Sequence, residues 1–215
     1  MKSMLLKDLY NLRSSVRYLA VMMLVFAVAF IPMGYLNYLT MGAVVFSIMM
    51  VNTFSYDDLA KWNRFALVMP IRRQDVVAGK FLISLLFSAV GTGIGCLGSV
   101  VGGALLGQLQ LSDAQAWKEI LSVMEIAFCV ALLFGVTMIP LLFRFGVERA
   151  RLISAGAVAL PILAFFAFYK IPGLKELLLT QTGIRLMLLF CPVFTLLWAI
   201  AMYQVSCLIF LKKEF

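Results

Sequence analysis

Long apolar runs alternate along the chain with short polar segments, and the apolar runs make up most of its length. A helix needs roughly 20 apolar residues to cross the hydrocarbon layer of a membrane. Six runs come close enough to this length to predict six transmembrane helices in one all-α transmembrane domain, residues 1–215. Their approximate bounds are 18–36, 39–56, 81–106, 120–143, 152–169 and 186–211.

The composition agrees with an integral membrane protein. Hydrophobic residues make up 64% of the chain and charged residues 13%, and the mean hydropathy is +1.04. Soluble domains are nearer half apolar and a quarter charged. The chain has no histidine, and its four cysteines all lie inside apolar runs. Because histidine is the commonest general base and metal ligand, we predict neither catalytic residues nor a metal site.

The basic residues are distributed unevenly between the two sides that six spans define. Most of the 18 lysines and arginines fall in the N-terminal segment, the loop after the second span, the fourth loop and the C-terminal tail. Cytoplasmic loops carry the excess of Lys and Arg in membrane proteins. We therefore predict that both termini and the 57–80 loop lie in the cytoplasm.

Two further segments are expected at the membrane surface. In residues 1–17, Leu5, Leu9 and Leu12 recur near helical spacing with charged residues between them. This pattern predicts an amphipathic surface helix before the first span; the alternative is a helical extension of that span. The loop 170–180 is half apolar, and a short interfacial helix and an ordinary ordered loop explain it equally well.

The third span carries glycines in pairs four residues apart. Small residues at this spacing let helix backbones approach closely, and packing drives helix association in lipid. We expect packing within the chain, and the alternative is a face that moves or dimerises. The pairs are Gly91/Gly95, Gly98/Gly102 and Gly103/Gly107.

Glu125 is the one carboxylate predicted inside a span. An acid within the membrane is costly and is therefore a functional candidate, for example as a possible intramembrane polar site for protons. Glu125 also lies near the predicted outer boundary. A shorter fourth span would place it among the lipid headgroups instead.

A polar segment at residues 57–75 interrupts the apolar pattern after the second span. Its apolar residues recur near helical spacing up to a proline, which predicts a short amphipathic helix. A surface helix held by lipid would show this pattern, and so would a protein-docking site with an aromatic face ringed by arginines. The apolar residues are Leu59, Trp62, Phe65, Ala66 and Met69, and the proline is Pro70.

Two activities are disfavoured for this segment. Gly79 and Lys80 lack the upstream glycine and the following Ser or Thr of a phosphate-binding loop, so we do not expect the chain to hydrolyse ATP by itself. Contact with nucleic acid is disfavoured because the basic residues of the 57–80 loop stand beside acids at a bilayer surface.

The segment from Tyr56 to Lys80 resembles the one after the second span in type-two ATP-binding-cassette transporter permeases. The resemblance is closest to the small bacterial branch linked with peptide export and immunity. The shared features are an acidic start, a Lys-Trp-polar-Arg core, a Leu-x-x-Pro sequence, basic residues before an acid, and a closing lysine. The order of surface helix, six spans and large second cytoplasmic loop is similar to that family over the whole chain.

The resemblance implies that residues 57–69 form a coupling helix on a separate ATPase subunit, with ATP and Mg bound in that subunit and no cofactor in this chain. The implied coupling residues are Asp57, Asp58, Lys61, Trp62, Asn63, Arg64, Phe65, Met69, Arg72, Arg73 and Asp75. A second, smaller cytoplasmic contact is implied at Arg144, Glu148, Arg149 and Arg151.

We therefore predict a permease subunit, not itself an enzyme, of an ATP-driven exporter in the bacterial cytoplasmic membrane. Two copies would pair, as a homodimer or a heterodimer. The substrate would be amphipathic or hydrophobic, such as a peptide, because the spans offer few polar ligands. The alternatives are a six-span substrate-binding module for vitamin uptake and a proton-coupled secondary transporter that uses Glu125.

Overall fold

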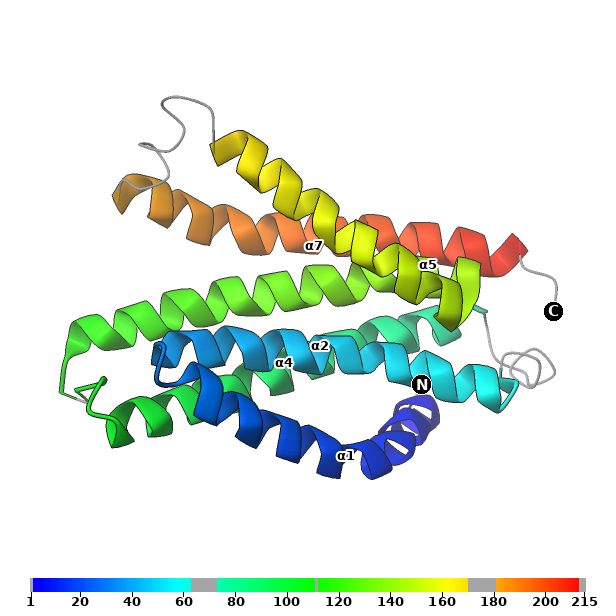
Figure 1. Ribbon diagram of the computed structural model, residues 1–215. Helices are drawn as coiled ribbons and strands as arrows, with labels where there is room; N and C mark the ends of the chain where they lie inside the picture. Colours follow the sequence, from blue (N-terminus) through cyan, green and yellow to red (C-terminus); the bar gives the residue numbers. More distant parts are fainter. Residues whose placement is uncertain (1, 63–72, 111, 170–180, 213–215) are drawn as a thin grey trace.

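The computed structural model describes residues 2–62, 73–110, 112–169 and 181–212, and the regular structure in these ranges is helical. The prediction of an all-α protein is therefore confirmed. Long helices run side by side in alternating directions (Figure 1). They are α1 (Lys2–Phe30), α2 (Tyr35–Leu59), α4 (Arg73–Leu105), α5 (Ala114–Tyr169) and α7 (Gln181–Lys212).

Four helical stretches in the described part of the chain are long and apolar enough to cross a membrane. They coincide with the predicted second, third, fourth and sixth spans. The apolar part of α1, Arg17–Phe30, is shorter. The predicted fifth span, 152–169, forms the last part of α5, but its side chains other than that of the exposed Ile153 lie outside the described residues. The six-span count therefore stays a prediction. The four stretches are Tyr35–Leu59, Gln74–Leu105, Ala114–Ala150 and Leu188–Leu211.

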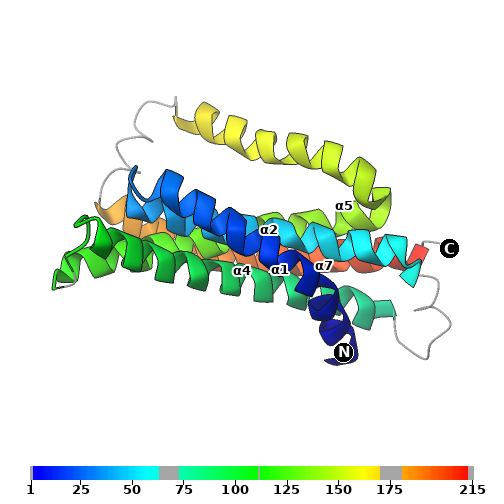
Figure 2. The ribbon, with the colours of Figure 1, turned by 60° about the horizontal axis from the view of Figure 1, so that its bottom comes forward.

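The N-terminal segment and the start of the first predicted span belong to one helix, since α1 is unbroken from Lys2 to Phe30. This continuity fits the alternative of a helical extension. The first turns nevertheless lie at an angle to the rest of α1 (Figure 2). A position on the membrane surface stays a prediction.

The first hairpin lies earlier than expected. The spans predicted at 18–36 and 39–56 place the first reversal around Asn37, but the turn occupies residues 31–34 and Asn37 already belongs to the first turn of α2. Gly34 has φ +139°, a conformation that side chains disfavour, and its carbonyl accepts a hydrogen bond from the Asn37 amide at 3.0 Å. Pro32 cannot donate a backbone hydrogen bond, which helps to end α1 here.

The glycines of α4 pack against α2, which confirms the expectation of packing within the chain. A methyl group added at Gly95 would lie 2.7 Å from the carbonyl oxygen of Leu39, and one added at Gly42 would lie 2.8 Å from the Cα of Gly95. Gly93, on the other side of α4, has open space around it. The two backbones thus approach closely because the contact positions have no side chain.

Helix α5 doubles back on itself at Gly146, where φ is 73° and ψ is 174°. The bend separates a first arm, which packs among α2, α4 and α7, from a second arm that diverges from it (Figure 2). The predicted fourth loop, 144–151, is this bend rather than an extended loop. Glycine suits the position because only glycine adopts a positive φ without strain.

One end of the bundle gathers the start of α1, the end of α2, the start of α4, the bend of α5 and the end of α7 (Figure 1). The other end carries the 31–34 turn and the 106–113 connection. The end of α2 and the start of α4, which lie on either side of the predicted coupling segment, are therefore at the same end of the bundle as the start of α1 and the end of α7.

Candidate functional site

Helix α2 extends into the polar segment and ends at Leu59. Ala60 closes the helix with a hydrogen bond from its amide to the Tyr56 carbonyl, and Lys61 then adopts a φ of +49°. The prediction of one helix over residues 57–69 is therefore wrong at its start. A left-handed residue breaks the helical path, so any separate coupling helix starts no earlier than Trp62.

Asp57 lies one turn before that break, and its side chain points into the protein. It is 3% exposed and sits between two lysines. One carboxylate oxygen is 2.5 Å from Lys7 Nζ, and the other is 2.6 Å from Lys80 Nζ. Lys80, the eighth residue of α4, is 4% exposed. The two ends of the segment are thus joined by a buried ion pair.

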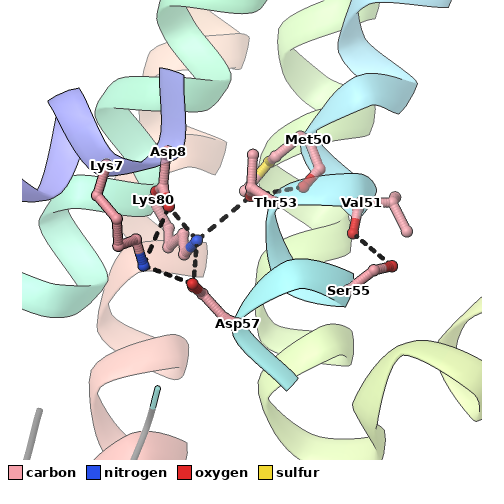
Figure 3. A network of polar contacts seen from close by, with 8 residues as sticks. All are labelled: Lys7, Asp8, Met50, Val51, Thr53, Ser55, Asp57 and Lys80. Carbon is pink, nitrogen blue, oxygen red and sulfur yellow. Dashed lines mark hydrogen bonds and ion pairs between the residues drawn. The ribbon is translucent and has the colours of Figure 1, made fainter. Parts of the chain in front are cut away.

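The N-terminal helix completes the site. Asp8 is 3% exposed and accepts from Lys80 Nζ at 3.1 Å, while its other oxygen lies 3.2 Å from Lys7 Nζ. Each lysine therefore contacts both carboxylates, and each carboxylate contacts both lysines (Figure 3). We call these four residues, Lys7, Asp8, Asp57 and Lys80, the charge cluster.

Neutral groups surround the two ammonium ions. Lys80 Nζ donates to Thr53 Oγ1 at 3.3 Å and lies 4.8 Å from the centre of the Phe54 ring. Lys7 Nζ lies 4.2 Å from the centre of the Trp62 ring. Aromatic faces attract cations. Lys7 therefore contacts both Asp57, before the break at the end of α2, and Trp62, just after it.

The charge cluster is electrically neutral. Isolated buried charges are costly, and a buried pair is tolerated when its hydrogen bonds are satisfied. Removing one member leaves an uncompensated charge away from water. The arrangement therefore holds three helices, α1, α2 and α4, together at this end of the bundle.

An apolar cluster lies beside the charge cluster and extends to the bend of α5. Phe54 contacts Phe143 edge-to-face with ring centres 5.0 Å apart, and Phe143 contacts Phe210 of α7 at 5.1 Å. Trp62 and Val147 pack against the same cluster. The polar segment and the 144–151 bend, which we predicted as two separate contacts, thus share one core.

The remaining predicted residues divide into exposed, half-buried and undescribed positions. Exposed among the coupling residues are Asp58 and Lys61, together with the apolar Leu59, which is 81% exposed. Trp62 and Asp75 are half-buried. At the bend, Arg144, Glu148 and Arg149 are exposed. Outside the described residues lie Asn63, Arg64, Phe65, Met69 and Arg72, and the side chains of Arg73 and Arg151.

Glu125 is half-buried on the first arm of α5 and is not part of the charge cluster. Its role in proton coupling stays a prediction.

Sequence reasoning missed the roles of Lys7, Asp8 and Lys80. It treated the first two as the polar face of a surface helix and the third as the close of a loop. Asp8 and Lys80 are 72 positions apart, and no local pattern pairs residues so distant. The sequence shows only that Lys7 and Asp8 are adjacent charged residues of opposite sign, which does not reveal their partners on other helices.

The fold and the site define a helical membrane protein whose buried charges gather at one end of an apolar bundle. A family model described as ABC-2 family transporter protein matches residues 3–211. The chain belongs to this family. Its members are transport components of membranes that in general work with a separate ATPase subunit. Comparisons with curated proteins and with solved structures gave no match.

Proposed function

We propose that this chain is the permease subunit of an ATP-driven exporter and that residues 57–80 transmit the action of a separate ATPase. The charge cluster is the observation that supports this proposal most strongly. Asp57 and Lys80 flank the exposed part of the segment and are paired inside the bundle. When the ATPase moves the exposed residues of this segment, the Asp57–Lys80 ion pair therefore transmits the movement to both α2 and α4.

The exposed residues at the end of α2 supply the first contact with the ATPase. Leu59 offers an apolar side chain, and Asp58 and Lys61 flank it with charges of both signs. An apolar centre with a polar rim is the usual composition of a protein interface. Trp62, one of the implied coupling residues, is half-buried and packs against the chain's own core and Lys7. In this proposal it fixes the segment to the bundle.

The bend of α5 supplies the smaller second contact. Arg144, Glu148 and Arg149 are exposed there, and neighbouring Val147 packs on the same apolar cluster as Trp62. Movement at the end of α2 or at the bend of α5 therefore acts on the same apolar cluster. Packed helices that can adopt two discrete arrangements can couple two such sites.

ATP and Mg bind in the partner, since the chain carries no phosphate-binding loop. Two permease copies pair, and each rests on one ATPase. The exporter lies in the bacterial cytoplasmic membrane with both termini in the cytoplasm, because most of the basic residues fall on that side. Its substrate is amphipathic or hydrophobic, such as a peptide.

Glu125 supports one other candidate function, a proton-coupled secondary transporter. A half-buried acid on a helix long enough to span a membrane is the observation in its favour. The two proposals differ in their energy source. A proton gradient would drive transport by the purified chain alone, whereas an exporter permease would need its ATPase and ATP.

The test is to purify the tagged chain from its own cells in mild detergent and to measure ATP hydrolysis. We expect Mg-dependent hydrolysis to co-purify with a second chain that carries a phosphate-binding loop, and to vanish when that chain is removed. Hydrolysis by the isolated permease, or proton-driven transport without any ATPase, would contradict the proposal.

A further inference from the structure

We propose that Lys7 and Asp8 are positioning residues of the coupling apparatus. They tie α1 to both ends of the 57–80 segment, so that α1, α2 and α4 respond to the ATPase as one unit. This inference rests on the proposed function and adds a third helix to it.

Charge balance alone does not require the contribution of α1. Asp57 and Lys80 are 2.6 Å apart and neutralise each other. Lys7 and Asp8 add one charge of each sign, so the net charge of the cluster is the same with or without them. What they add is a link, because Lys7 contacts Asp57 of α2 and Asp8 contacts Lys80 of α4.

Lys7 also fixes the direction in which the chain leaves α2. Its ammonium group contacts Asp57 and lies 4.2 Å from the centre of the Trp62 ring. Lys61, with its left-handed backbone, stands between these two residues. One lysine from α1 therefore contacts the chain on both sides of the point where it turns.

Helix α1 has a second attachment near its other end. Met23 and Ile31 pack with Tyr38 and Val45 of α2 in a small buried cluster, and the Tyr38 hydroxyl donates to the Met23 carbonyl at 3.4 Å. Side chains between the two attachments include Tyr18, which is 80% exposed. Opening the charge cluster would thus release the start of α1 while the buried cluster still holds its end.

The decisive variant combines Lys7→Gln with Asp8→Asn. It removes the link from α1 and leaves the neutral Asp57–Lys80 pair, so the bundle is expected to fold. The matched control combines Lys118→Gln with Glu119→Gln. Lys118 and Glu119 are also a consecutive lysine and acid, and both are exposed in the first turns of α5. The start of α5 lies at the opposite end of the bundle (Figure 1).

The first measurement needs no ATPase. A spin label is placed on Lys61→Cys in a background without the four native cysteines, and the purified chain is studied in lipid vesicles. We expect the label to shift toward its mobile spectrum in the Lys7/Asp8 variant and to stay unchanged in the control. An unchanged spectrum in a folded Lys7/Asp8 variant overturns the positioning role.

The second measurement uses the complex with the co-purified ATPase. We expect the Lys7/Asp8 variant to keep the ATPase bound but to lose most of the stimulation of ATP hydrolysis by the permease. Full stimulation overturns the inference. If the unaltered chain binds no ATPase, the proposed function fails, and the spin-label result still decides whether α1 positions the segment.

Discussion

The Asp57 carboxylate of α2 and the Lys80 ammonium group of α4 lie 2.6 Å apart, and both side chains are buried. They stand on either side of the segment that the sequence marks as the coupling site. Their ion pair joins the end of α2 to the start of α4. A movement of one of these helix ends therefore acts on the other.

The first prediction concerns this pair. Asp57→Asn leaves Lys7 and Lys80 with one carboxylate, Asp8, and such a loss in a buried pair costs about 3–5 kcal/mol of unfolding free energy. Asp58→Asn is the matched control, because Asp58 is the exposed neighbour and surface changes usually stay within about 0.5 kcal/mol. Denaturant unfolding in detergent measures both. Equal stabilities would show that the charge cluster does not hold the helices.

The second prediction concerns the contact between α2 and α4. A methyl group at Gly95 would lie 2.7 Å from the Leu39 carbonyl oxygen, so Gly95→Ala must separate the two backbones. Overpacking of this kind costs about 1–3 kcal/mol. Gly93→Ala, which meets open space, is expected to be neutral or slightly stabilising because alanine favours helix. Thermal unfolding of the two variants tests this, and an equal response would contradict the close packing.

The third prediction concerns topology. Lys61 follows the end of α2 and Ser112 precedes the start of α5, and both are exposed. The end of α2 and the start of α5 lie at opposite ends of the bundle (Figure 1). With a single cysteine at each position in turn, a membrane-impermeant thiol reagent on intact cells is expected to label position 112 and not 61. Position 61 should react only after the membrane is opened. Labelling at 61 alone in intact cells would invert the orientation that the basic residues predict.

The fourth prediction concerns Glu125. In an exporter driven by ATP, Glu125→Gln is expected to leave ATP-driven transport largely intact, because no proton moves through the side chain. In a proton-coupled transporter the same change would abolish transport together with its pH dependence. Uptake or release in vesicles across a range of pH separates the two cases.

The length of the apolar runs predicted the four membrane-length helical stretches of the described residues, because apolar runs of this length have few other stable structures in lipid. The sequence pattern was less accurate at the turns. It placed the first reversal at Asn37, a polar residue, although Pro32 and Gly34 carry the backbone chemistry of the turn. The family resemblance, in turn, began the coupling helix at Asp57, whereas α2 continues to Leu59. The break at Lys61 depends on a backbone conformation that lysine rarely adopts, and the side-chain pattern gave no sign of it.

The site was only partly predictable. Resemblance to a family pointed to the polar segment, and the structure gives Asp57 a buried place inside it. Lys7 and Asp8 could not be assigned from the sequence, because their partners Asp57 and Lys80 belong to other helices. Contacts between distant segments follow from how the helices pack, which local periodicity does not specify.

The most direct test of the central claim is the affinity of the permease for its ATPase when one exposed residue is changed. Leu59 and Leu105 are each 81% exposed and are the last residues of α2 and α4. These two helices end at opposite ends of the bundle (Figure 1). Loss of an interface anchor costs about 2 kcal/mol or more, so Leu59→Ser is expected to weaken binding of the purified ATPase about 30-fold. Leu105→Ser is expected to leave binding unchanged. If both variants bind the ATPase as tightly as the unaltered chain, the end of α2 is not the transmission site.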